Sequence, residues 1–109
     1  MINEFLTVEE FDSAYDCIKR VIHRTPVLRA SLLGREAGVD LYIKCENLQK
    51  TGSFKVRGDL YKTLQLSPDA KSRGVVTVSA GNHAQALAWA SQTAAKKARY
   101  GFSASAVSG

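Results

Sequence analysis

Apolar residues recur at three- and four-residue intervals near the start of the chain. These positions are Val8, Phe11, Tyr15, Ile18 and Ile22. Such spacing places them on one face of an amphipathic helix, which we expect over residues 8–22. Thr7, followed three residues later by Glu10, forms the capping-box pattern that marks a helix start. Pro26 disfavours helical geometry in the residue before it, so the helix should end before that point.

Further along, the pattern alternates between helical and extended segments. A short helix is expected over residues 30–36, followed by a strand over 41–46, where apolar and polar side chains alternate. A second helix should run from Ser53, as its N-cap, to about Leu64. A short helical turn is expected next, with Pro68 at its first position.

The stretch "GVVTVSA" is a β-branched run typical of a fully buried parallel strand. It leads directly into "GNHAQALAWA", which is rich in alanine and leucine and predicts another helix. Alternating strands and helices favour an α/β fold with a parallel sheet. The strands are too few to complete such a sheet.

The composition is that of a soluble globular protein, with 45% hydrophobic and 23% charged residues in 109 residues, enough for one small domain. No apolar run approaches the length that crosses a bilayer, and the acidic N-terminus does not resemble a secretory signal. We therefore expect a cytoplasmic protein without a membrane partner. The net charge of +5 is scattered, which favours solvated helix faces over a nucleic-acid-binding surface.

The two cysteines, Cys17 and Cys45, are far apart and show no CxxC spacing. This pattern indicates neither a disulfide framework nor a metal site. We expect both to be ordinary buried or half-buried thiols.

The stretch "TGSFKVRGD" places Lys55 between Phe54 and Val56 in the first turn of an expected helix. The positive end of the helix dipole and desolvation both disfavour a charged amine there. A neutral amine is the form that attacks a carbonyl and makes a Schiff base. The alternative is a lysine that extends its ammonium into solvent, and position alone favours that alternative.

A second candidate site is "SAGNHAQ", residues 79–85, where the expected strand turns into a helix. Ligands bind beyond the carboxyl ends of strands in open parallel sheets, and free N–H groups at a helix start bind anions. The alternative is a plain strand-to-helix turn capped by Asn82, which this stretch alone favours. No orienting carboxylate is evident for His83, so we expect a packing or capping residue there rather than an acid–base group.

Together, "KCENLQKTGSFKVRG" and "VSAGNHAQALA" resemble the N-terminal part of fold-type II pyridoxal-phosphate enzymes. The chain is most similar to the threonine/serine dehydratases and their relative serine racemase, over roughly residues 5–92. The matching residues are Thr25, Pro26, Lys44, Glu46, Gln49, Thr51, Gly52, Ser53, Phe54, Lys55, Arg57, Gly58, Ser79, Gly81, Asn82, His83, Ala84 and Gln85. The resemblance implies an α/β fold with part of a three-layer parallel sheet and flanking helices, similar to the N-terminal part of the tryptophan synthase β-like fold.

The resemblance also implies roles for individual residues. Lys55 would hold pyridoxal 5'-phosphate as a Schiff base, Phe54 would pack beside the cofactor, and Asn82 would hydrogen-bond its ring hydroxyl. The substrate carboxylate would be bound by Ser79, Gly81, Asn82 and His83. No metal is implied. The implied reaction converts L-threonine, or L-serine, to a 2-oxo acid and ammonia, which for threonine is 2-oxobutanoate. For a full-length protein, the resemblance also implies a homo-oligomer.

Two positions depart from parts of this family. Serine racemase-like sequences carry a second serine where this chain has Ala80, and a methyl group cannot move a proton, so dehydration is favoured over racemisation. A racemase-like enzyme remains the alternative. Asp59 stands where the family usually has alanine. On the helix of Lys55, this carboxylate could face solvent or act on the lysine charge.

The likeness ends near residue 92. We expect residues 1–92 to be the N-terminal portion of a dehydratase catalytic region and residues 93–109 a divergent tail, disordered or produced by a frameshift or truncation near residues 92–98. The glycine-rich loop that binds the cofactor phosphate in this family is absent from the 109 residues. The chain alone should therefore be inactive, and a non-catalytic remnant or interaction module is a further alternative.

Overall fold

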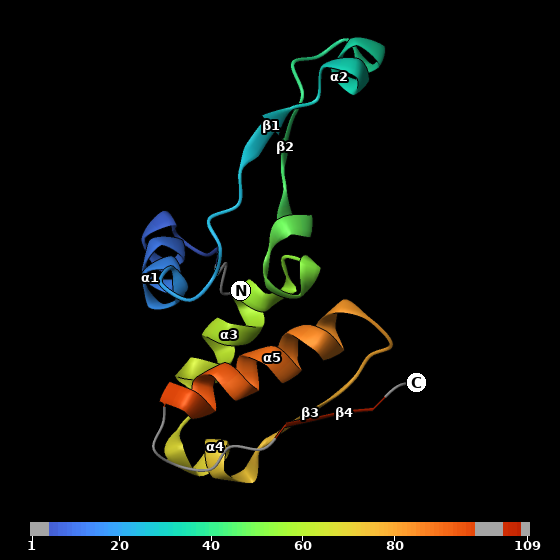
Figure 1. Cartoon of the computed structure of the whole chain (residues 1–109). Helices are drawn as coiled ribbons and strands as arrows, with labels where there is room; N and C mark the ends of the chain where they lie inside the picture. Colours follow the sequence, from blue (N-terminus) through green and yellow to red (C-terminus); the bar gives the residue numbers. More distant parts are fainter. Residues whose placement is uncertain (1–4, 98–103, 108–109) are drawn as a thin grey trace.

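The computed structural model describes residues 5–97 and 104–107 (Figure 1). Helices, short 3₁₀ turns and strands follow one another along the chain. In order they are α1 (Val8–Ile18), β1 (Val27–Arg29), α2 (Ser31–Ala37), β2 (Tyr42–Lys44), η1 (Glu46–Leu48), η2 (Lys50–Gly52), α3 (Lys55–Gln65), α4 (Pro68–Arg73), β3 (Val75–Val78), α5 (Asn82–Lys97) and β4 (Ala104–Val107).

The core of the molecule lies between α3 and α5, which pack side by side (Figure 1). Val56 and Leu60 of α3 and Ala86 and Ala90 of α5 are fully buried in this contact. The alanines leave little side-chain bulk between the helices, so the leucine and valine of α3 pack close to the backbone of α5. Ile18, at the end of α1, and Ile22, just after it, complete the cluster.

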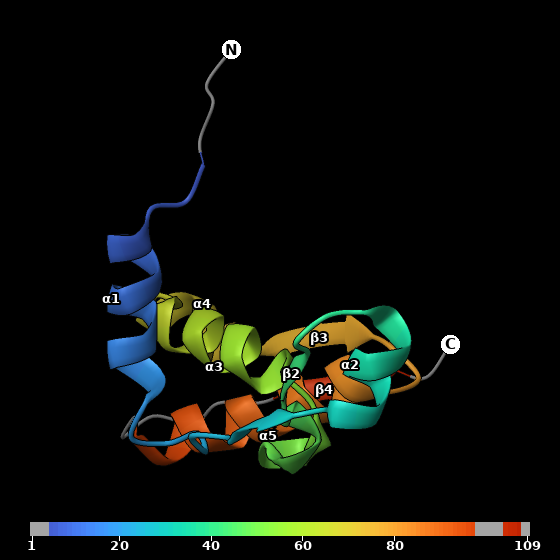
Figure 2. The same cartoon turned by 90° about the horizontal axis from the view of Figure 1, so that it is seen from above.

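The strands form two separate two-stranded sheets. β3 pairs with β4 in parallel, from Val75 opposite Ala104 to Val78 opposite Val107, and α5 connects them as a βαβ crossover. β1 pairs with β2 in antiparallel fashion, and α2 connects the two strands at the tip of an arm that extends away from the helical core in Figure 1; Figure 2 shows the same arm from above. The α/β class with a small sheet and flanking helices is confirmed.

Several local expectations differ from the structure. The strand expected over residues 41–46 is antiparallel, and its partner β1 was not predicted. α1 ends at Ile18 rather than residue 22, because the N–H of Val21 donates to the Ile18 carbonyl at 2.9 Å and tightens the chain into a turn. Ile22 is still buried.

The expectation of a fully buried β3 is wrong. Burial alternates along this strand, and Val76 and Val78 each remain 70% exposed because no element covers their face among the described residues. In the tail, α5 extends to Lys97 and β4 forms over Ala104–Val107. The division at residue 92 stays a prediction.

Both cysteines are free thiols, as expected, but Cys17 is exposed rather than buried because its face of α1 points away from the core. Within residues 5–97 and 104–107, no helix is both long and apolar enough to cross a membrane.

Candidate functional site

The loop before α3 has an unusual backbone. Thr51 has φ 59° and Gly52 has φ 76°, two successive residues in the left-handed region. Glycine adopts this conformation freely, whereas a β-branched threonine is strained in it. The hydroxyls of Thr51 and Ser53 are buried and have no hydrogen-bond partner among the described residues. The expected N-cap role of Ser53 is wrong, because α3 starts two residues later with Phe54 in the cap position and no side-chain cap.

Lys55 is the first residue of α3 and its side chain is exposed. Its Nζ lies 5.2 Å from the centre of the Phe54 ring, and Phe54 is itself 60% exposed. Among the described residues, Nζ makes no ion pair. Of the two alternatives for this lysine, the structure has the one that its position favours, because the amine extends to solvent beside an aromatic face.

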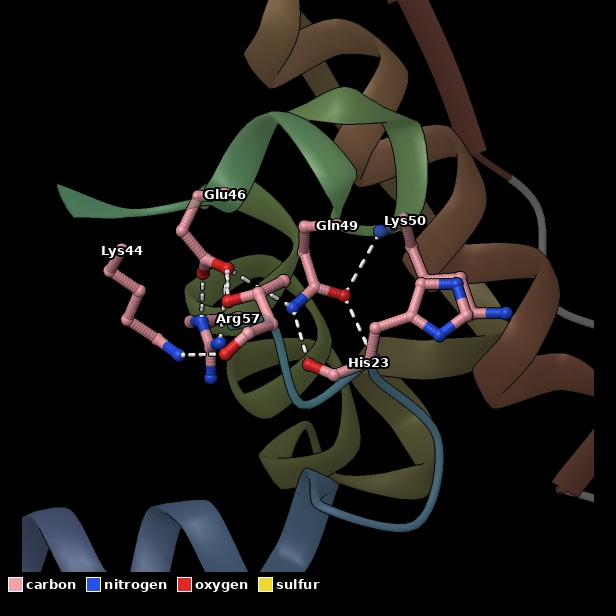
Figure 3. A network of polar contacts seen from close by, with 7 residues as sticks. His23, Lys44, Glu46, Gln49, Lys50 and Arg57 are labelled. Carbon is pink, nitrogen blue, oxygen red and sulfur yellow. Dashed lines mark hydrogen bonds and ion pairs between the residues drawn. The ribbon is translucent and has the colours of Figure 1, made fainter. Parts of the chain in front are cut away.

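Two residues after Lys55, the Arg57 side chain is held in a network of polar contacts (Figure 3). Its Nε donates to Glu46, and its Nη2 donates to Glu46 Oε2 at 3.2 Å. The hydroxyl of Thr25 donates to the same oxygen at 2.7 Å. The hydrogen-bonded Arg57 guanidinium lowers the pKa of Glu46 from 4.5 to about 2, although partial burial opposes the shift.

Gln49 extends this network to the segment after α1. Its side-chain oxygen accepts hydrogen bonds from the backbone N–H groups of His23 and Lys50, each at 2.9 Å, and its Nε2 donates to the His23 carbonyl at 2.7 Å (Figure 3). Lys44 Nζ donates to the Thr25 carbonyl at 3.0 Å. These contacts tie the chain at residues 23–25 to η1 and η2, and so fix the loop that carries Phe54 and Lys55.

The second motif forms the turn from β3 into α5. The Ser79 hydroxyl accepts a hydrogen bond from the Gly81 N–H at 3.3 Å, and the Gly81 carbonyl accepts the first helical bond from Gln85, also at 3.3 Å. Asn82 is therefore the first residue of α5 rather than its cap, and its side chain is exposed. The turn presents the unpaired N–H groups that begin every helix.

His83 links the two motifs. Its Nδ1 lies 3.0 Å from Oδ2 of Asp59, which is one turn beyond Lys55 on α3. The expectation that no carboxylate orients His83 is wrong, and Asp59 contacts this imidazole rather than Lys55 or solvent alone. Because the two residues are 24 positions apart on different helices, no periodicity within the sequence could reveal the pair.

The predicted site residues thus come together in part. Phe54 and Lys55 adjoin each other, Ser79 and Gly81 share a hydrogen bond, and His83 joins the Lys55 helix through Asp59. No hydrogen bond connects Lys55 to residues 79–82 in the described part of the chain. A groove of about 780 Å³ lies elsewhere, between α1 and α3, and contains none of the predicted site residues.

Comparisons with known proteins agree with the motifs. Serine racemase of Dictyostelium discoideum is 49% identical over 87 residues, covering 80% of this chain and 27% of the relative. L-threonine ammonia-lyase of Thermotoga maritima is 48% identical over 87 residues, covering 80% of this chain and 22% of the relative. The chain thus spans about a quarter of the length of the curated relatives it matches.

Comparison with solved structures identifies the same kinds of enzyme. The crystal structure of the Dictyostelium discoideum serine racemase matches with a TM-score of 0.81 and 43% identity, over 94% of this chain and 32% of that one. Residues 18–107 match the family described as pyridoxal-phosphate dependent enzyme. The match covers most of the chain and includes both motifs, so this chain belongs to the pyridoxal-phosphate dependent enzymes.

Proposed function

We propose that this chain carries the lysine-bearing part of a pyridoxal-phosphate-dependent ammonia-lyase site for a hydroxy amino acid, L-threonine or L-serine. The observation that carries the proposal is the state of Lys55. Its amine is exposed at the start of α3, beside the Phe54 ring, and no carboxylate among the described residues neutralises it. Such an amine is accessible to a carbonyl compound.

The surrounding residues fit the cofactor. The exposed Phe54 ring offers an apolar face to a flat pyridine ring, and the helix start beside it favours an anionic group. Asn82, exposed at the start of α5, offers an amide that both donates and accepts hydrogen bonds, as a ring hydroxyl requires. Pyridoxal phosphate, when bound, supplies an electron sink for charge that develops at the carbon next to the amino group.

Groups of the protein itself would bind the substrate and transfer its proton. The free backbone N–H groups in the first turn of α5, at Asn82 and His83, would bind the substrate carboxylate. The amine of Lys55 would accept the proton of the α-carbon. The β-hydroxyl would leave as water, and hydrolysis of the resulting enamine by a second water would give a 2-oxo acid and ammonia.

Ala80 supports a lyase rather than a racemase. Racemisation needs a proton-carrying group on each side of the substrate, and in racemase-like sequences a serine at this position provides the second one. The methyl group of Ala80 holds no transferable proton. The relatives themselves do not decide, because the racemase and the ammonia-lyase are 49% and 48% identical to this chain.

A second candidate function is a non-catalytic interaction module. The exposure of Val76 and Val78 on one face of the β3–β4 sheet favours it, because an uncovered apolar strand face offers a contact surface. The chain also spans only about a quarter of its relatives, so we expect the 109 residues alone to bind the cofactor weakly and to turn over no substrate.

The cofactor proposal is tested by absorbance during titration with pyridoxal phosphate. We expect a saturable Schiff-base band that disappears in Lys55→Ala. Lys62→Ala is the matched control, since Lys62 is an exposed lysine on the same helix, and this variant should keep the band. An identical band in Lys55→Ala would contradict the proposal and favour the interaction module.

The reaction class is tested separately, by measuring 2-oxobutanoate from L-threonine and D-serine from L-serine. The 109-residue chain should form neither product. Clear formation of 2-oxobutanoate would contradict the expectation that this chain is inactive, and it would support the lyase reaction. D-serine formation would contradict the choice of a lyase over a racemase.

A further inference from the structure

Asp59 and His83 form a carboxylate–imidazole pair between the two helices that carry the candidate site. Asp59 Oδ2 and His83 Nδ1 are 3.0 Å apart, and the two side chains are 15% and 42% exposed respectively. Asp59 lies four residues after Lys55, and His83 follows Asn82 at the start of α5. The pair therefore bridges α3 and α5 one turn from the amine.

The chemistry of this contact fixes the position of a hydrogen. An ionised carboxylate only accepts hydrogen bonds, so Nδ1 of His83 must be the donor. A neutral imidazole carries a single ring hydrogen, and placing it on Nδ1 leaves Nε2 with a free lone pair. Asp59 thus selects the imidazole tautomer in which Nε2 is a hydrogen-bond acceptor.

The environment of Asp59 supports a specific role. Its backbone carbonyl accepts a hydrogen bond from the Thr63 hydroxyl at 2.6 Å, and its carboxylate contacts His83. Thr63 is 1% exposed, so this part of α3 is well packed. The enzymes that this sequence resembles usually have alanine at the position of Asp59. Packing of the helix therefore does not itself require a carboxylate there.

We propose that Asp59 is a positioning residue that holds His83 in the Nδ1–H tautomer, with Nε2 available to accept a hydrogen bond from an O–H or N–H group of the ligand. The ligand part rests on the proposed function, for which a hydroxy amino acid offers a hydroxyl and an ammonium. The tautomer is a property of this chain alone. It can therefore be measured without cofactor, substrate or turnover.

The test is a long-range ¹H–¹⁵N spectrum of the 109-residue chain with ¹⁵N-labelled histidine, under alkaline conditions in which free imidazole is neutral. The chain contains two histidines, so His23 serves as the internal reference, and His83→Gln assigns the signals. We expect His83 to show Nδ1–H as the major form. In Asp59→Ala the ratio should reverse toward Nε2–H, the form that a free histidine side chain prefers.

The control variant is Asp69→Ala, which removes an exposed aspartate that pairs with Arg73 and does not contact His83. It should leave the His83 tautomer unchanged. Asp59→Asn keeps the size of the side chain if the alanine variant fails to fold. Because an amide accepts more weakly and can also donate, Asp59→Asn should lower the Nδ1–H share.

Two results would overturn the inference. One is a major Nε2–H form of His83 in the unmodified chain. The other is a tautomer ratio that stays the same in the folded Asp59 variants. Failure of the Lys55 absorbance band with a correct His83 tautomer would instead refute the proposed function and leave the role of Asp59 in place.

Discussion

Lys55 and Arg57 are two cations in the first turn of α3, yet their side chains have different surroundings. Arg57 is bound to Glu46 within a network that also includes Thr25 and Gln49. The Lys55 ammonium is exposed and contacts an aromatic ring. Both positions face the positive end of the helix dipole, which is unfavourable for a cation. Arg57 is compensated by a carboxylate, whereas Lys55 has no such compensation among the described residues.

The difference separates a structural residue from a candidate functional one. Arg57 and its partners join the chain before β1 to the loop before α3, so their contacts contribute to folding. Lys55 contributes no comparable contact, which leaves its amine available to a ligand. If this comparison holds, substitutions at the two positions should have opposite consequences for stability and for cofactor binding.

The largest expected effect on stability is that of Arg57→Ala. The substitution leaves the Glu46 carboxylate, 17% exposed, without its cation, and should lower the free energy of unfolding by about 2–4 kcal/mol in urea titrations. Arg73→Ala is the control, because the Arg73–Asp69 pair is exposed and should contribute less than about 1 kcal/mol. Equal losses in the two variants would refute a special role for the Glu46 network.

Acid should break the same network. The pKa of Glu46 is about 2 in the folded chain, against 4.5 as its ordinary value, so the unfolded chain takes up this proton first as the pH falls. The stabilisation is present above about pH 4.5 and is lost progressively down to about pH 2, by about 3 kcal/mol. Unfolding measured across this range should be less pH-dependent in Glu46→Gln. An unchanged pH dependence in that variant would show that other carboxylates dominate.

A smaller and opposite effect is expected in the loop between the network and Lys55. Thr51→Gly removes a strained backbone conformation at φ 59° and a buried hydroxyl without a partner. Glycine adds flexibility to the unfolded chain, so the net gain in unfolding free energy should be about 1 kcal/mol. A loss of stability in thermal unfolding would mean that the threonine hydroxyl has a partner the structure does not contain.

The smallest expected effect on stability is that of Lys55→Ala. Because the side chain is exposed and makes no ion pair with any described residue, the free energy of unfolding should change by no more than about 0.5 kcal/mol in urea. The same variant should lose the cofactor absorbance band. A large destabilisation would show that Lys55, like Arg57, contributes to the stability of the fold.

Much of the fold could be predicted from local patterns. The start of α1 at Thr7, α2 close to its expected residues 30–36, and α4 with Pro68 at its first position agree with the sequence, because each is set by residues within one or two turns. β1 was missed because three residues after a proline carry no period that distinguishes a strand from a loop. The exposure of Val76 depends on which elements cover the sheet. A run of β-branched residues in the sequence does not indicate whether such elements are present.

The candidate site was predictable as two motifs but not as an arrangement. Lys55, Asn82 and Ser79 could be proposed as site residues because each motif is continuous in the sequence, and their roles stay predictions. The Asp59–His83 pair was missed because it depends on how α3 and α5 pack. The sequence left two alternatives for Lys55, because a neighbouring apolar residue such as Phe54 buries an amine only when it is buried itself, and Phe54 is exposed.

The most direct test of the central claim is borohydride reduction of the chain in the presence of pyridoxal phosphate, followed by peptide mapping of every lysine. Lys50 and Lys62 lie in the same part of the chain as Lys55 and serve as internal controls. We predict that the pyridoxyl adduct is concentrated on Lys55. Label spread evenly over the three lysines would contradict a cofactor site at the start of α3.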